Sequence, residues 1–161
     1  RGQAMNFLTT KITSIYNEKG FTLTELLIVV AIIGILTLIA YPTYQSQMLK
    51  TRRSDAKIAL TEIANREEKF FSNSDSPHYT GTILSSPPVP PNPPTGLGYT
   101  STLSPQSYYT LSIAAGTTGN LTTSFVATAK AAATGAQAGD TTCSTMTIDN
   151  TGTKAPLSGC W

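Results

Sequence analysis

A run of residues without one charged side chain constrains this chain more than any other feature. It covers residues 26–49, and its first fifteen positions are almost entirely Leu, Ile, Val, Ala and Gly. As one helix, these 24 residues would be about 36 Å long, against a bilayer hydrocarbon core of roughly 30 Å. A removable secretory signal has a shorter apolar stretch and a small-residue cleavage site, whereas Tyr41 and Pro42 occur here. We therefore expect an anchor that stays with the protein.

Charged residues are concentrated directly after this run. Residues 50–69 contain six positive and four negative side chains, whereas residues 70–161 contain five charges in all. Apolar residues recur there at steps of three and four, and neither Gly nor Pro interrupts residues 43–71, which predicts an amphipathic helix. We expect one helix over residues 21–71. Gly34 and Pro42 are its weak points, and we expect a kink or local melting at Pro42, which lacks a backbone donor.

The remaining residues predict a small sheet. Three segments have the composition of β-strands, namely residues 108–113, 123–129 and 144–149. A turn at residues 149–152 leads into a fourth short strand. Short spacings favour an antiparallel meander, because parallel neighbours would need crossover helices. Residues 85–98 contain six prolines and are expected to be an extended spacer, or alternatively an adhesion surface. The predicted fold is α+β, with a long N-terminal helix packed on a four-stranded antiparallel sheet.

Composition disfavours several classes of function. Residues 21–161 carry eight positive and eight negative side chains, and this balance argues against a dedicated nucleic-acid binder. A basic cluster early in the charged segment is expected to be a solvated helix face at headgroup level, with a DNA-contacting patch as the alternative; it consists of Lys50, Arg52, Arg53 and Lys57. The single histidine, His78, has no nucleophile or metal-ligand set around it in the sequence, so we expect no catalysis and no cofactor.

The most informative motif precedes and enters the apolar run. Lys19, Gly20 and Phe21 are followed by Glu25, the only carboxylate in an otherwise apolar helix. Together with the apolar run that ends in Ala40-Tyr41-Pro42, this motif resembles the N-terminus of type IV pilins. In that family, a prepilin peptidase of the inner membrane cuts after the glycine and methylates the new N-terminal Phe.

The resemblance implies a division of the chain into three parts. Residues 1–20 would be a leader removed by cleavage between Gly20 and Phe21, with Met5 as the start and residues 1–4 as an upstream extension. Residues 21–49 would form the transmembrane and filament-core helix, beginning with N-methylated Phe21. Residues 50–161 would form the globular head.

Glu25 requires a partner or a solvated position, because a charged carboxylate is costly inside a bilayer. One interpretation places it at headgroup depth. The other, which the resemblance favours, pairs it with the α-amino group of Phe21 in a neighbouring subunit, which would neutralise both charges and set the register between helices.

The two cysteines have a structural interpretation. The chain ends in Gly159-Cys160-Trp161, similar to pilins of the PilE type, whose heads are closed by a C-terminal disulfide loop. A bond between Cys143 and Cys160 would stabilise the head by about 3 kcal/mol in the chain-entropy model. Two free thiols, or a zinc site that also uses His78, are the alternatives.

The expected function is assembly. The resemblance implies a pilus subunit that waits in the inner membrane with its head in the periplasm and is then built into a cell-surface filament for motility, adhesion or DNA uptake. Its partners would be other pilin subunits, the prepilin peptidase, the inner-membrane assembly platform, membrane lipid before assembly, and DNA as a weakly supported addition. The alternative is a pseudopilin of a type II secretion system. The sequence leaves open whether the subunit is a major or a minor one.

Overall fold

The computed structural model describes residues 20–85 and 96–161. The predicted leader, apart from Gly20, and most of the proline-rich segment therefore lie outside the described residues. The chain divides into two compact units, residues 1–40 and 41–161, and each is treated by itself. Helix α1 (Leu23–Asn73) passes from the first unit into the second.

Helix α1 begins two residues later than expected because Thr22 caps it. The Thr22 hydroxyl accepts a hydrogen bond from the Glu25 backbone N–H at 3.2 Å, and the Thr22 carbonyl accepts one from the Leu26 N–H at 3.2 Å. Thr followed three residues later by Glu is the sequence of a capping box, a known start signal for helices. The helix then continues through Gly34 and Pro42 without a break, so the expected local melting at Pro42 does not occur. A kink there stays a prediction.

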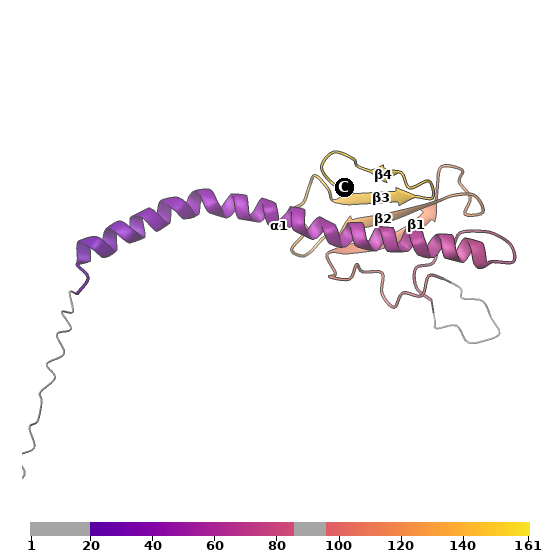
Figure 1. The fold of residues 1–161 in the computed structure, drawn as a ribbon, viewed down its shortest axis with the longest axis horizontal. Coiled ribbons are helices and arrows are strands. Elements are labelled where there is room, and N and C mark those ends of the chain that lie inside the picture. Colours follow the sequence, from indigo (N-terminus) through magenta and orange to yellow (C-terminus); the bar gives the residue numbers. More distant parts are fainter. Residues whose placement is uncertain (1–19, 86–95) are drawn as a thin grey trace, which may run out of the picture. The chain divides into compact units, whose positions relative to one another are not determined.

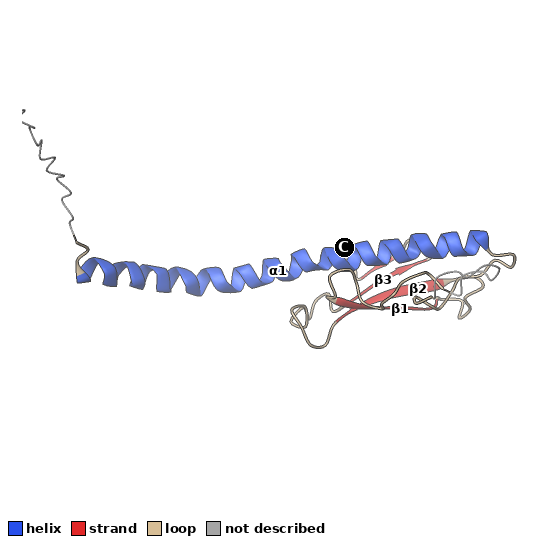
Figure 2. Cartoon of the chain, turned by 90° about the horizontal axis from the view of Figure 1, so that it is seen from below, coloured by secondary structure: helices blue, strands red, loops and turns tan. Residues whose placement is uncertain are grey.

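The second unit contains a four-stranded antiparallel sheet in the order β1-β2-β3-β4. Its strands are β1 (Tyr109–Ala115), β2 (Phe125–Ala131), β3 (Thr145–Asp149) and β4 (Lys154–Ala155). Every neighbouring pair is consecutive in sequence, which confirms the predicted meander. The C-terminal half of α1 lies along one face of this sheet, so the head has two layers (Figures 1 and 2).

The core of the head lies between these layers. From α1 it takes small and medium side chains that are 0–1% exposed, namely Ala56, Ala59, Leu60 and Ile63. Alternate residues of the strands meet them, including Tyr109, Phe125, Ala127, Ala129 and Met146. Alanines on both sides allow the helix backbone to approach the sheet closely, while Tyr109 and Phe125 fill the remaining volume.

The hairpin between β3 and β4 also forms as predicted. Asp149 Oδ1 accepts hydrogen bonds from the backbone N–H groups of Thr151 and Thr153, each at 2.9 Å. Gly152 has a φ of +78°, a left-handed conformation that glycine adopts without the steric cost of a Cβ. Burial alone would raise the pKa of Asp149, but hydrogen bonds from Thr151 and Thr153 outweigh it and hold the pKa below its usual value.

Candidate functional site

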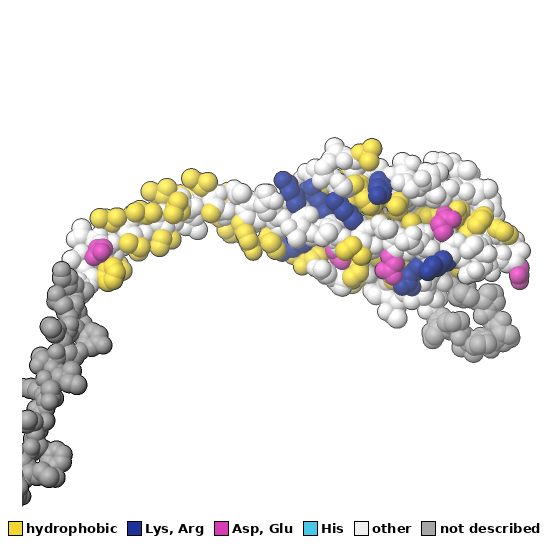
Figure 3. Space-filling model, in the orientation of Figure 1, with side chains coloured by type: hydrophobic (Ala, Val, Ile, Leu, Met, Phe, Trp, Pro, Cys, Tyr) yellow, Lys and Arg dark blue, Asp and Glu magenta, His cyan; other side chains and the backbone are white. Residues whose placement is uncertain are grey.

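The N-terminal half of α1 presents apolar side chains all around. Phe21, Leu23 and Leu38 are 78–80% exposed, and every other large apolar residue up to Tyr44 is also exposed within this chain. Figure 3 shows these hydrophobic side chains along the helix. Among the described residues, α1 is the one helix long and apolar enough to cross a membrane. Such a surface needs lipid or other apolar helices around it.

Glu25 differs from the other residues of this segment. The hydroxyl of Thr37 is satisfied within the helix, because it donates to the carbonyl of Ile33. The carboxylate of Glu25 makes no hydrogen bond or ion pair with any other described residue of this chain. Glu25 lies in the first turn of α1, and Phe21 lies two residues before the helix begins. The described residues of this chain thus provide no partner for the Glu25 carboxylate.

Cys143 and Cys160 form the disulfide that the resemblance implied. Their Cα atoms are 5.6 Å apart, and both residues are fully buried. The bond joins the segment before β3 to the end of the chain. Trp161 then lies over β4, where its indole N–H donates to the Ala155 carbonyl at 3.3 Å and Lys154 approaches its ring. The C-terminal loop is thus held to the sheet edge covalently and by side-chain contacts.

Arg53 attaches this same loop to α1. Its Nε donates to Asp140 Oδ2 at 2.7 Å and its Nη2 to Asp140 Oδ1 at 2.9 Å, a two-pronged ion pair that is almost completely buried. Its Nη1 donates to the Gly159 carbonyl at 3.0 Å. Burial alone would raise the pKa of Asp140, but the hydrogen bond from Arg53 and another from the Cys143 N–H hold the pKa below its usual value. The hydrogen bond from Arg53 to Asp140 raises the pKa of Arg53.

Gln137 extends the hydrogen-bond network of Arg53 and Asp140 across the interface between α1 and the rest of the head. Its Nε2 lies within hydrogen-bond distance of three oxygens: the Leu49 carbonyl, the Tyr109 hydroxyl and Asp140 Oδ2. The network therefore connects α1, β1 and the β2–β3 segment. Because Gln137 lies 88 residues from Leu49 and 28 residues from Tyr109, no local pattern could have indicated these two contacts. Arg53 in particular is not part of a solvated basic cluster, which corrects that expectation.

Burial changes the charge balance that the sequence indicated. Three acids of the head are buried, Asp55, Glu67 and Asp140, but only one base, Arg53. Of the charged residues in 50–161, all of which the structure describes, seven cationic and four anionic side chains are therefore not buried. The surface of the head is more basic than the composition suggests. The equal numbers of positive and negative side chains in residues 21–161 are therefore no longer a strong argument against nucleic-acid binding.

The outer face of the sheet, opposite α1, carries one of these cations near the end of β2. Lys130 is exposed on β2, and the register places it between Thr110 of β1 and Thr145 of β3. Ser112, Thr128 and Thr147 form the next row across the same face. Ammonium and hydroxyl groups are the side chains that commonly contact phosphate oxygens of nucleic acids. This face therefore presents a cation flanked by rows of hydroxyl side chains.

Two protein families match the chain. The prokaryotic N-terminal methylation motif matches residues 15–41, and the family described as type IV minor pilin ComP, DNA uptake sequence receptor, matches residues 42–147. The second match covers well over half of the chain. The fold has a long helix with an apolar N-terminal half, an antiparallel meander sheet and a C-terminal segment that a disulfide closes. This fold is that of a pilin. The chain therefore belongs to the type IV pilins, in the minor-pilin family ComP, and these are structural subunits rather than enzymes.

Curated relatives resemble mainly the N-terminal part. The chain is 46% identical over 58 residues to the type IV major pilin PilA of Myxococcus xanthus, covering 36% of this chain and 26% of that protein. It is 60% identical over 62 residues to the fimbrial protein EcpB of Eikenella corrodens, covering 38% and 39% respectively. For the major pilin PilE1 of Neisseria gonorrhoeae, the identity is 41% over 66 residues, covering 37% and 40%. The matched part thus spans between a quarter and two fifths of these relatives.

A solved structure of a type IV pilin from Shewanella oneidensis is also similar. It has 20% sequence identity and a TM-score of 0.44, with 70% of this chain and 97% of that chain covered.

Proposed function

We propose that this chain is a minor subunit of a type IV pilus and that its head binds DNA during uptake. The observation that carries this proposal is the family match over residues 42–147, because it covers the head and not the N-terminal motif that pilins share. The family described there is a receptor for a DNA uptake sequence. Among the three roles expected from the sequence, DNA uptake is therefore preferred to motility and adhesion. A secretion pseudopilin, the earlier alternative, has less support, because the relatives are pilins and fimbrial proteins.

Assembly would depend on the N-terminal segment. Cleavage by prepilin peptidase after Gly20 and methylation of Phe21 would generate the mature N-terminus, and the apolar helix would hold the subunit in the inner membrane. In the filament, the Glu25 carboxylate would form an ion pair with the α-amino group of a neighbouring subunit. Its lack of any partner among the described residues of its own chain supports this role. The head would lie in the periplasm before assembly and at the cell surface afterwards.

DNA would bind on the outer face of the sheet. This face is opposite α1, so it stays accessible when the apolar helices are bundled in a filament core. Lys130 supplies an exposed cation on this face, and the surrounding hydroxyls supply donors for phosphates. Binding through phosphates weakens as salt rises, because counterions released from DNA must be replaced.

The test uses the full chain in detergent, labelled duplex DNA carrying candidate uptake sequences, and a shuffled duplex. Fluorescence anisotropy at several salt concentrations gives the affinity and its salt dependence. The variant Lys130→Ala should bind about tenfold more weakly and should lower the magnitude of the salt slope by about one. Lys69→Ala, which removes an exposed cation from α1, serves as the matched control and should bind as wild type does. Absence of saturable DNA binding by the wild-type chain would refute the proposal, and equal loss in both variants would refute the assigned face.

A further inference from the structure

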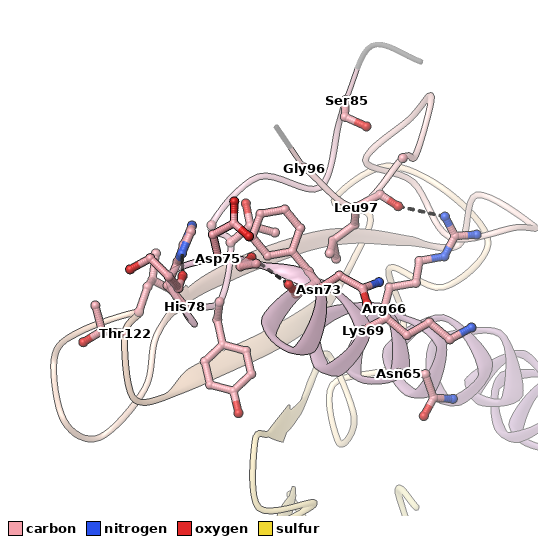
Figure 4. A pocket seen from close by; sticks show the side chains of 18 of the residues that line it. Asn65, Arg66, Lys69, Asn73, Asp75, His78, Ser85, Gly96, Leu97 and Thr122 are labelled. Carbon is pink, nitrogen blue, oxygen red and sulfur yellow. Dashed lines mark hydrogen bonds between the residues drawn. The ribbon is translucent and has the colours of Figure 1, made fainter. Parts of the chain in front are cut away.

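A second surface of the head is separate from the DNA face. A groove of about 1220 Å³ surrounds the C-terminal end of α1. Its lining comes from the last turns of the helix, the following segment 74–81, residues 96–98 and the turn 120–122. Figure 4 shows His78 and Thr122 on one side of the helix end and Arg66 and Leu97 on the other. The groove has the size of a site for a small molecule or a few linked rings.

One wall of the groove is rigid. The Leu97 N–H donates to the Thr82 carbonyl at 3.1 Å, which holds two extended segments together. A Cβ added at Gly96 would come within 2.6 Å of the carbonyl oxygens of Thr82 and Leu84, so only glycine permits this approach. The wall is therefore formed before any ligand arrives, and little ordering would be needed on binding.

The charges around the groove cancel. Arg66 is already paired with Glu62, with Nε–Oε1 at 3.0 Å, and its Nη1 donates to the Leu97 carbonyl at 2.8 Å. The remaining formal charges in the lining are one ammonium and one carboxylate, Lys69 and Asp75. The last turn of α1 contains no basic side chain, and the C-terminal end of a helix dipole is negative. Phosphate and carboxylate ligands are therefore disfavoured here.

The uncharged polar groups are suited to hydroxyl ligands. The side-chain amides of Asn65 and Asn73 form no hydrogen bond with other described residues, and each offers both donors and an acceptor. Asn120 uses its Oδ1 to accept from the Thr122 N–H at 3.0 Å, which leaves its NH₂ group for a ligand. The ring of Phe70 adds apolar surface beside them. A ring with hydroxyls at its rim and C–H groups on its faces matches both kinds of surface.

From these observations, we infer that the groove at the C-terminal end of α1 binds a neutral saccharide. The ligand would be one or a few hexose or N-acetylhexosamine units without acidic groups. This inference goes beyond the proposed DNA binding and does not depend on it, since the two surfaces share no residue.

The test measures saccharide binding to the full chain in a detergent that has no sugar headgroup. Lactose, maltotriose and chitotriose are the neutral probes, and sialyllactose is the anionic comparator. Saturation-transfer NMR detects contact, and titration calorimetry at up to about 10 mM ligand gives affinities. At least one neutral probe should bind saturably, and more tightly than sialyllactose. If none of the neutral probes binds, or if sialyllactose binds more tightly, the inference is wrong.

Variants locate the site. Asn65→Leu combined with Asn73→Leu should weaken saccharide binding about tenfold or more, since each lost hydrogen bond costs several-fold in affinity. Both residues are exposed, so the fold should be retained, which circular dichroism checks. Gln106→Leu removes an exposed amide outside the groove and should leave the affinity unchanged. Shifts in the amide NMR signals of Asn73, His78 and Asn120 with ligand give a readout that needs no mutation. Unchanged affinity in the double variant, or shifts confined to other residues, would overturn the assignment.

Discussion

The two halves of α1 are one continuous helix with opposite surroundings. In the N-terminal half, Leu, Ile and Val side chains remain exposed on every side, although this is the more apolar half. In the C-terminal half, Ala56, Ala59, Leu60 and Ile63 are almost completely buried, although charged residues separate them. A narrow apolar stripe is sufficient to fill one face of a sheet, whereas an all-round apolar surface can only be covered by lipid or by other helices. The arrangement of apolar residues, more than their number, therefore decides which half forms the core.

The largest effect should come from a change in the exposed half that leaves the head untouched. Glu25→Ala should be cleaved, should accumulate in the inner membrane, and should be depleted about tenfold or more from sheared filaments, because a neighbouring amino group loses its partner in an apolar core. Quantitative immunoblots of membrane and filament fractions give the measurement. Thr24→Ala, in the same turn, should assemble as wild type does. Equal filament occupancy for Glu25→Ala and wild type would show that Glu25 is only an interfacial carboxylate.

The next effect concerns the stability of the head, and it should come from a change of Arg53 in the buried half. Arg53→Ala leaves Asp140 buried without its ion partner, and this should lower the free energy of unfolding of the head by about 3–5 kcal/mol. Urea denaturation followed by tryptophan fluorescence measures it, since Trp161 lies on the loop that Arg53 holds. Lys50→Ala, also on α1, removes an exposed side chain and should cost less than about 1 kcal/mol. Similar losses for the two variants would contradict the assigned role of the buried pair.

Removal of the disulfide should have a somewhat smaller effect. Cys143→Ser combined with Cys160→Ser opens a loop with a sequence separation of 17 and should destabilise the head by about 3 kcal/mol. The same denaturation assay applies, and wild type under reducing conditions should match the double variant. Membrane insertion of the apolar half should not change. A loss of stability below about 1 kcal/mol would show that Arg53 holds the loop without help from the covalent bond.

The smallest of these effects concerns pH. Glu67 is fully buried on α1; its Oε2 accepts from the Thr80 N–H at 2.9 Å, and burial raises its pKa from 4.5 to about 7. Because the folded state holds this proton more tightly, the head should lose about 1–3 kcal/mol of stability as the pH rises from about 4.5 through 7. Urea midpoints between pH 5 and 8 measure this. In Glu67→Gln, the urea midpoint should depend less on pH. A wild-type midpoint that does not change between pH 5 and 8 would contradict the prediction.

Local patterns were sufficient to predict the elements of the head. Apolar spacing predicted α1, and alternation with Gly and Asn turns predicted the strands and their order. The Thr22 cap starts α1 two residues after the predicted position, because capping depends on the local backbone geometry. The contacts of Arg53 and Gln137 could not be predicted, since their partners are 87 and 88 residues away and depend on the packed fold. The same reason explains why the surface charge of the head was underestimated: which acids become buried is decided by tertiary structure.

The bond from Arg53 to Gly159 has a consequence for the order of folding. It joins residues 106 positions apart. A contact of such long range carries a high loop-closure cost, so it forms only after other contacts have brought its two ends together. The closure around Arg53 is therefore a late step in the folding of the head, and until that step the guanidinium of Arg53 stays in water.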